Sequence, residues 1–141
     1  MMQKPNIKLY SVVIDCPDPQ ALAQFYGKLI GWNIVFTNEE YTVLGAPHTA
    51  QGAYPGITFQ LNPNYIPPVW PEQRDAQQQM EHLDFAVEDP DAAVAYALQL
   101  GASRSPVQFS DDWIVMFDPV GHPFCLCKMK SMMDRPEFAL K

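Results

Sequence analysis

The sequence predicts an α+β fold built from two tandem β-α-β-β-β modules within a single domain of 141 residues. The first observation is a repeated helix start, Asp18-Pro19 and again Asp89-Pro90. The second is that a β-prone run precedes each pair, at 8–14 and at 81–87. The third is that further strand-like runs follow each helix in the same order. An internal repeat of one supersecondary unit explains all three observations.

Both helices have defined ends. The Asp of each pair is an N-cap acceptor, and the Pro suits the first helical turn. In the second helix Val94, Ala97 and Leu98 form an apolar stripe, and Gly101 ends it. Gly31 ends the first helix, where the stripe consists of Leu22, Phe25, Tyr26, Leu29 and Ile30.

The remaining strands follow from β-prone runs bounded by turn residues. The first module has strands at 32–37, 41–44 and 56–61, with a turn at 38–40. The second has strands at 104–109, 113–117 and 124–128, with turns at 110–112 and 119–121. Strand alternation predicts core positions on the helix side of the strands at Tyr10, Val12, Ile14, Phe59, Phe85, Phe124 and Leu126.

These elements divide the chain into module one at about 7–62 and module two at about 80–128. Residues 63–79 are rich in Pro and Gln and carry no helical stripe, so they form a surface linker. The aromatic residues of this linker are expected to anchor it to the body. The tail at 129–141 shows no pattern that predicts structure.

Composition and charge exclude several classes of protein. Apolar residues make up 48% of the chain and charged residues 18%, which excludes a disordered acidic tail. No apolar run approaches the roughly 20 residues of a membrane span, so no membrane partner is expected. The net charge of −7 comes with no basic cluster, so no nucleic-acid partner is expected either. Three cysteines and no apolar leader favour a cytoplasmic protein without disulfides.

Five segments in a fixed order resemble the vicinal oxygen chelate superfamily, which has the glyoxalase and bleomycin-resistance fold. The resemblance covers about residues 7 to 128 and is strongest with the small glyoxalase-like domain proteins. It implies that the modules form a cupped, mostly antiparallel sheet with the helices outside, and that the protein is a homodimer. The segments are 11–18, 25–32, 82–89, 100–102 and 118–124, the last reading Asp-Pro-Val-Gly-His-Pro-Phe.

The same resemblance implies where a metal ion would bind. Metal-dependent members hold a divalent ion with four inward residues, usually His and Glu, and here those positions are Ser11, Gln60, His82 and Cys125. Only His82 is an ordinary transition-metal ligand, and both carboxylates are absent. We therefore expect no cofactor and no isomerisation by the usual glyoxalase I mechanism, with a divalent metal as the disfavoured alternative.

His82 and Asp84 are the candidate catalytic residues. Strand alternation places them on one face, where a carboxylate can orient an imidazole whose ordinary pKa is near neutrality. The alternative is a histidine that persists from a metal-binding ancestor and only bonds Asp84 or a water molecule.

The other candidates line the cup. Cys125 and Cys127 share a face, and Lys128 points away from it, so no lysine of this strand would lower the pKa of either thiol. The two cysteines are therefore expected to line the cup as small side chains and not to act as nucleophiles. Trp70 and Trp113 either stack on a ligand or serve as packing. His122 is predicted to be a turn residue and Cys16 a structural residue, whereas His48 lies in a loop and carries little information.

Three functions follow. The first is a metal-free protein that binds a small organic molecule in the cup. The second is an enzyme, either a degenerate metal-dependent lyase, isomerase or dioxygenase using His82, or an acid–base isomerase using His82 and Asp84. The third is a scaffold whose cup is vestigial. For the first, the substrate-binding residues would be Leu9, Ser11, Val13, Gln60, Asn62, Trp70, His82, Asp84, Trp113 and Cys125.

Overall fold

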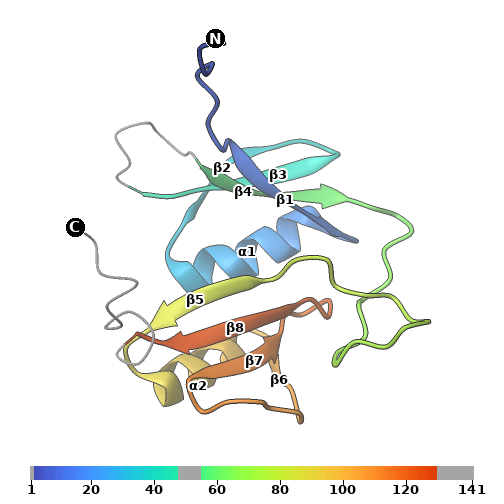
Figure 1. Ribbon diagram of the computed structural model, residues 1–141, viewed down its shortest axis with the longest axis vertical. Coiled ribbons are helices and arrows are strands. Elements are labelled where there is room, and N and C mark those ends of the chain that lie inside the picture. Colours follow the sequence, from blue (N-terminus) through green and yellow to red (C-terminus); the bar gives the residue numbers. More distant parts are fainter. Residues whose placement is uncertain (1, 48–54, 130–141) are drawn as a thin grey trace. The chain divides into compact units, whose positions relative to one another are not determined.

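Figure 1 shows a computed structural model of the chain, which describes residues 2–47 and 55–129. The chain divides into two compact units, and the boundary falls between Tyr65 and Ile66. Each unit contains the predicted order β-α-β-β-β. The expectations for His48 and for the tail from residue 130 onwards lie outside the described residues.

The first unit is a four-stranded mixed sheet with one helix. Its strand order is β1-β4-β3-β2, in which β1 and β4 are parallel and the other neighbours are antiparallel. The α1 helix covers one face, where Tyr26 stacks on Phe59 with ring centroids 5.5 Å apart. The elements are β1 (Ser11–Cys16), α1 (Pro19–Ile30), β2 (Asn33–Thr37), β3 (Tyr41–Gly45) and β4 (Gly56–Leu61).

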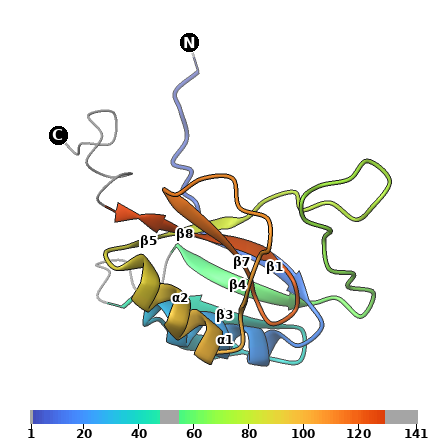
Figure 2. The same cartoon turned by 90° about the horizontal axis from the view of Figure 1, so that it is seen from below.

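The second unit repeats this topology. Its strand order is β5-β8-β7-β6, again with the outer pair β5 and β8 parallel and the others antiparallel. The α2 helix contacts β8 and β6 and covers one face of the sheet, as Figure 2 also shows. The elements are β5 (Leu83–Val87), α2 (Pro90–Gln99), β6 (Ser103–Arg104), β7 (Trp113–Phe117) and β8 (Pro123–Lys128).

Both helix starts and the end of α1 at Gly31 are confirmed, whereas α2 has Leu100 as its C-cap and Gly101 follows with φ 110°. The Asp18 side chain accepts from the backbone N–H of Ala21, and Asp89 accepts from Ala92, as N-caps do. Gly31 has φ 75°, a left-handed conformation that favours glycine. In α2 the prediction for Leu98 is wrong: Val94 and Ala97 are buried, whereas Leu98 is 46% exposed at the flank of this shorter helix.

The first strand of each unit starts later than predicted. The β1 strand begins at Ser11 because its partner β4 begins opposite it at Gly56. Tyr10 therefore precedes the sheet and is 74% exposed, so its predicted place in the core is wrong. The β5 strand begins at Leu83, which leaves His82 just before the strand. Its partner β8 begins at Pro123, which has no N–H to extend the ladder.

The other predicted core positions divide by strand. Phe59, Phe124 and Leu126 lie on the central strands β4 and β8 and are fully buried, as predicted. The residues on the edge strands are only half-buried, because an edge strand has a neighbour on one side alone. These are Val12 and Ile14 of β1 and Phe85 of β5.

The predicted strand at 104–109 is wrong, since β6 ends at Arg104. The Gln108 side chain takes the place of a strand backbone. Its carboxamide nitrogen donates to the carbonyl of Val115 at 2.9 Å, and its oxygen accepts from the Val115 N–H at 2.9 Å. The same nitrogen donates to the Ser105 carbonyl, so one amide satisfies groups that a ladder would otherwise pair. Pro106 has no N–H to donate to such a ladder.

Within the described residues, neither helix has the length and apolar character needed to cross a bilayer.

Candidate functional site

The strand register gives the second sheet one face that α2 does not cover. Asp84 pairs with Cys125, which pairs with Val115, and Cys127 pairs with Trp113. The neighbouring residues Phe85 and Phe124 point the other way, where their rings meet 5.9 Å apart. We call the uncovered side the second-sheet face; its residues are Asp84, Ala86, Trp113, Val115, Phe117, Cys125 and Cys127.

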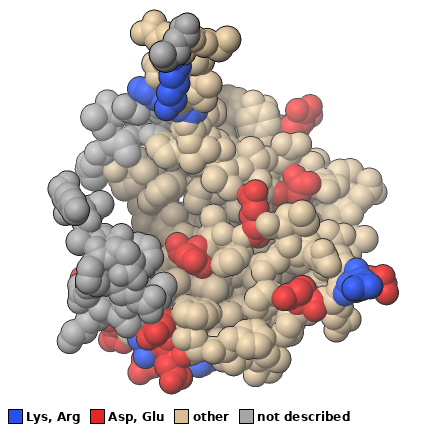
Figure 3. Space-filling model, viewed as in Figure 1, with Lys and Arg blue, Asp and Glu red and all other residues tan. Residues whose placement is uncertain are grey.

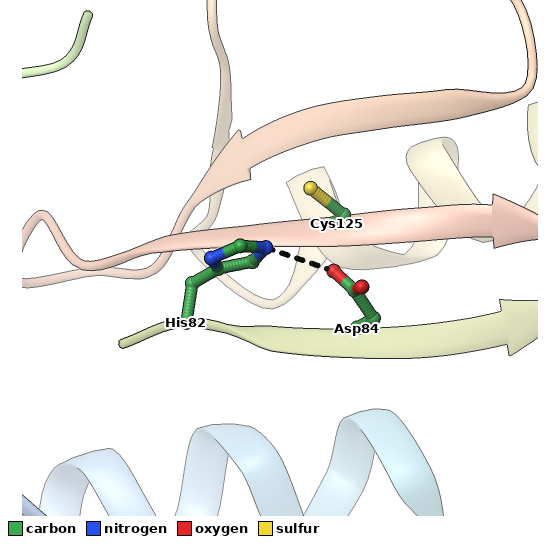
Figure 4. Close-up of side chains that lie close together, drawn as sticks. All are labelled: His82, Asp84 and Cys125. Atoms are coloured by element: carbon green, nitrogen blue, oxygen red, sulfur yellow. Dashed lines mark ion pairs between the residues drawn. The ribbon is translucent and has the colours of Figure 1, made fainter. Parts of the chain in front are cut away.

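Three side chains with potential chemistry meet at this face (Figure 4). His82 Nε2 lies 3.1 Å from Asp84 Oδ1, and the Cys125 thiol lies close to the same carboxylate. The ligand atoms of the three residues all lie within 4.8 Å of one another. The side chains of His82 and Asp84 are 41% and 59% exposed, whereas Cys125 is buried. We call these residues the His82–Asp84–Cys125 cluster.

Both thiols of the face are held in the protonated form. Burial raises the pKa of Cys125 to about 12, and the nearby Asp84 carboxylate adds to that shift. Burial, and then the charge of Asp84, raise the pKa of Cys127 to about 11. Because a thiolate is the nucleophilic form, these values support soft lining residues over nucleophiles.

An apolar and aromatic floor lies beside the cluster. Val115, Cys125 and Cys127 are buried together, and the indoles of Trp70 and Trp113 pack against them. The Trp70 ring also meets Phe109 edge-on at 6.1 Å. The expectation that the linker aromatics are anchored is thus met at Trp70.

The segment that carries Trp70 is closely fitted to the second unit. Pro67 approaches Gly121 so closely that a Cβ at Gly121 would lie 2.8 Å from the Pro67 ring, and Gly121 has φ 97°. The Val69 N–H donates to the Gln77 carbonyl at 2.7 Å, which closes the segment on itself. Trp70 Nε1 and Gln79 Oε1 are buried without a hydrogen-bond partner among the described residues.

The first unit holds the predicted residues Ser11, Val13 and Gln60 on the side of its sheet away from Phe59 and α1. Ser11 Oγ lies 2.7 Å from Thr58 Oγ1 and 3.1 Å from the Gly56 carbonyl oxygen. The Ser11 hydroxyl is therefore already paired within its own sheet. Val13 and Gln60 are exposed.

Leu9 is 65% exposed and precedes β1, and Asn62 donates to the Asp15 carboxylate at 3.1 Å. His122 is a turn residue, as predicted, with Nδ1 2.7 Å from Asp118 Oδ2. Cys16 is fully buried, with its thiol directed at the Gln60 carbonyl, as expected of a structural residue.

Two residues that shape these surfaces were not predicted. Strand alternation around Gln60 could have identified Thr58, the partner of Ser11, because the two lie on one face. Nothing in the sequence marks Gln108, whose partner Val115 is brought to it by folding.

The residues present do not match the four-ligand metal set of the family. At the first-unit positions stand Ser11, with its hydroxyl paired to Thr58, and Gln60, whose amide is a weak donor for transition metals. The second unit supplies His82 and Cys125, and Asp84 adds a third potential ligand from a position outside that set. What the second unit assembles is a mixed imidazole, carboxylate and thiol site.

The chain is similar to glyoxalase-type proteins both in sequence and in structure. The glyoxalase-like domain family matches residues 11–127. A glyoxalase/bleomycin resistance protein/dioxygenase family enzyme from Burkholderia phytofirmans has a TM-score of 0.62 at 18% identity, covering 86% of this chain and 98% of its own. Glyoxalase I from Leishmania major has a TM-score of 0.61 at 17% identity, covering 94% of each chain. No curated protein matches the sequence.

A bleomycin resistance determinant encoded on a transposon is also similar. Its TM-score is 0.53 at 14% identity, covering 86% of this chain and 98% of its own. At such low identity these structures bear on the fold alone, and the family match across most of the sequence decides membership. The chain belongs to the glyoxalase-like domain family, within the superfamily that has the glyoxalase and bleomycin-resistance fold.

Proposed function

We propose that this protein binds a small organic molecule on its second-sheet face, without a resident metal ion. The observation that carries the proposal is the His82–Asp84–Cys125 cluster beside the floor of Val115, Cys127 and two indoles. A few convergent polar groups on an apolar, aromatic surface are typical of small-molecule sites. The two polar side chains at the surface, His82 and Asp84, would orient the ligand.

The donor chemistry supports the metal-free form of the proposal. The paired Ser11 hydroxyl and the Gln60 amide offer a metal far less than the His and Glu of metal-dependent relatives. In the second unit, His82 and Asp84 already bond each other at 3.1 Å. An organic ligand needs only hydrogen bonds from these two side chains, whereas a metal ion needs a complete set of ligands.

A thermal-shift screen tests the proposal. Protein treated with a chelator is screened against a library of small amines, alcohols and carboxylic acids. A ligand at 100 times its Kd stabilises the folded state by about 2.7 kcal/mol, which raises the melting temperature measurably. We expect hits whose effect is lost in Ala86→Phe, because Ala86 is exposed on the second-sheet face and a phenyl ring would obstruct it.

Ala95→Phe is the matched control, since Ala95 is exposed on α2 and its substitution leaves the second-sheet face open. Hits that survive Ala86→Phe would move binding to another surface. A library without hits would contradict the proposal and favour a scaffold role.

A metal-dependent lyase, isomerase or dioxygenase is the second candidate. It is favoured by one observation, that the ligand atoms of His82, Asp84 and Cys125 lie within 4.8 Å of one another. Tetrahedral zinc ligands stand about 3.5 Å apart, so small side-chain movements would bring the three to one ion. In that case His82, Asp84 and Cys125 would hold the metal, which would act as a Lewis acid on the substrate.

Metal content separates the two candidates. Mass spectrometry of untagged protein, before and after incubation with Zn, Ni, Co, Mn and Fe(II), should find no stoichiometric metal. Stoichiometric metal that disappears in His82→Ala but persists in Ser11→Ala would replace the first proposal with the second. A homodimer and a cytoplasmic location stay predictions from the family resemblance and the composition.

A further inference from the structure

We propose that the ligand of the second-sheet face is an organic cation, namely a protonated amine carried on an aromatic ring. This inference rests on the proposed function and names the class of molecule that the face would select. Its basis is the placement of charge and of aromatic rings on the two sides of the second sheet.

The charged side chains of the sheet are sorted by face. Asp84 is the one carboxylate in the four strands, and it lies on the second-sheet face. Arg104 and Lys128 are the only Lys or Arg residues in those strands, and their partners Met116 and Val87 place them on the opposite side. The uncovered side of the sheet therefore carries a negative charge and no Lys or Arg from the strands.

The Asp84 carboxylate is available to a ligand. Its side chain is 59% exposed, and among the described residues its one ion pair is with His82. The protein as a whole carries a net charge of −7, and Figure 3 shows acidic side chains spread over one view with few basic ones. An ammonium group at Asp84 would form a charge-assisted hydrogen bond, whereas a carboxylate there would be repelled.

The aromatic rings stand at a suitable distance from this carboxylate. Trp113 lies two strands away from Asp84, on β7, with β8 between them. The register aligns Trp113 with Ala86, so two strand spacings and a two-residue offset amount to about 12 Å between the backbones of Trp113 and Asp84, and the side chains shorten that gap. A ring on a two-carbon amine can therefore contact the Trp113 indole or the neighbouring Trp70 while its ammonium reaches Asp84. An acceptor on the ring would also suit Trp70 Nε1, which has no hydrogen-bond partner in the described part of the chain.

Three matched phenols test this inference. Tyramine, tyrosol and 3-(4-hydroxyphenyl)propionate share a ring and chain but end in a cation, a neutral hydroxyl and an anion. Isothermal titration calorimetry of chelator-treated protein should give tyramine a Kd about tenfold below that of tyrosol. The propionate should bind most weakly.

The variant Asp84→Asn should remove the preference, so that tyramine and tyrosol bind equally. Asp91→Asn is the control, because Asp91 is exposed in the first turn of α2. It should keep the preference, and circular dichroism verifies that both variants are folded.

Two outcomes overturn the inference. Equal binding of tyramine and tyrosol to the unmodified protein, or a preference that survives Asp84→Asn, would contradict selection of a cation by Asp84 while leaving the proposed function intact. Failure of all three phenols to bind also overturns it, and the proposed function then stands or falls with the library screen and Ala86→Phe.

Discussion

The two units have the same topology but differ in the polar side chains on the sheet faces that their helices do not cover. In the first unit the hydroxyls of Ser11 and Thr58 form a hydrogen bond to each other across neighbouring strands, so they are already paired within the protein. In the second unit His82 and Asp84 bond each other yet stay largely exposed beside a protonated thiol. A repeated scaffold therefore does not imply two equal halves of a site, since a few side chains decide which face keeps polar groups available to a ligand.

The largest expected effect is a loss of stability on truncating a core side chain, because both units have a core between helix and sheet. Phe59 in the first unit and Phe124 in the second are both fully buried on a central strand. We expect Phe59→Ala and Phe124→Ala each to lower the free energy of unfolding by about 3–5 kcal/mol, through lost burial and a residual cavity. Denaturant unfolding measures both, and a loss below about 1 kcal/mol in either would contradict equivalent cores.

A smaller loss of stability is expected at Gln108, whose side chain replaces regular strand pairing in the second unit. Gln108→Ala removes the amide that bonds both backbone groups of Val115, so the buried Val115 N–H loses its partner, while the Val115 carbonyl keeps the bond from the Ser105 N–H at 3.0 Å. We expect a cost of about 1–3 kcal/mol by chemical denaturation. Gln20→Ala is the control, because Gln20 makes an exposed hydrogen bond to Thr37, and it should cost about 0.5 kcal/mol or less.

Ser11→Ala tests which of the two units binds the ligand. It removes the hydroxyl that bonds Thr58 and should lower stability by about 1 kcal/mol. Because the proposed ligand uses the second unit, its Kd should be unchanged in this variant, in contrast to Asp84→Asn. A large loss of affinity in Ser11→Ala, measured by calorimetry with tyramine, would make the first unit part of the binding site.

The smallest effect is expected for thiol chemistry at neutral pH. The pKa of Cys125 is about 12 and that of Cys127 about 11, and Cys16 is fully buried. Iodoacetamide should therefore modify the folded protein very slowly at pH 7, as measured by mass spectrometry of the peptides. Burial is the main cause of the raised pKa of Cys125, and the Asp84 carboxylate adds to it, so this thiol should react moderately faster in Asp84→Asn.

The same shifts predict a loss of stability at high pH. Because the pKa of each thiol is raised on folding from 9.0, the folded state keeps protons that the unfolded state releases. The stabilisation is complete below pH 9 and is lost as the pH rises to about 12. Denaturation curves measured across this range should show a smaller loss in Cys125→Ala than in the unmodified protein.

Much of the fold was predictable because its signals are local. The Asp-Pro caps and Gly31 identify the helix ends, and two-residue alternation separates Phe59 from its neighbours on the other face. The wrong predictions lie where a partner distant in sequence decides the outcome. The late start of β1 depends on Gly56, and the short β6 depends on the bonds between Gln108 and Val115.

For the site, the local pattern was enough to predict that His82 and Asp84 share a face and that Cys125 and Cys127 share a face, because backbone alternation depends only on neighbouring residues. Folding of the whole chain brings Asp84 into register with Cys125, pairs the Ser11 hydroxyl with Thr58, and packs Trp70 on Val115 and Cys127. Strand register and side-chain packing join segments far apart along the chain, so they follow from how the whole sheet closes rather than from any local pattern.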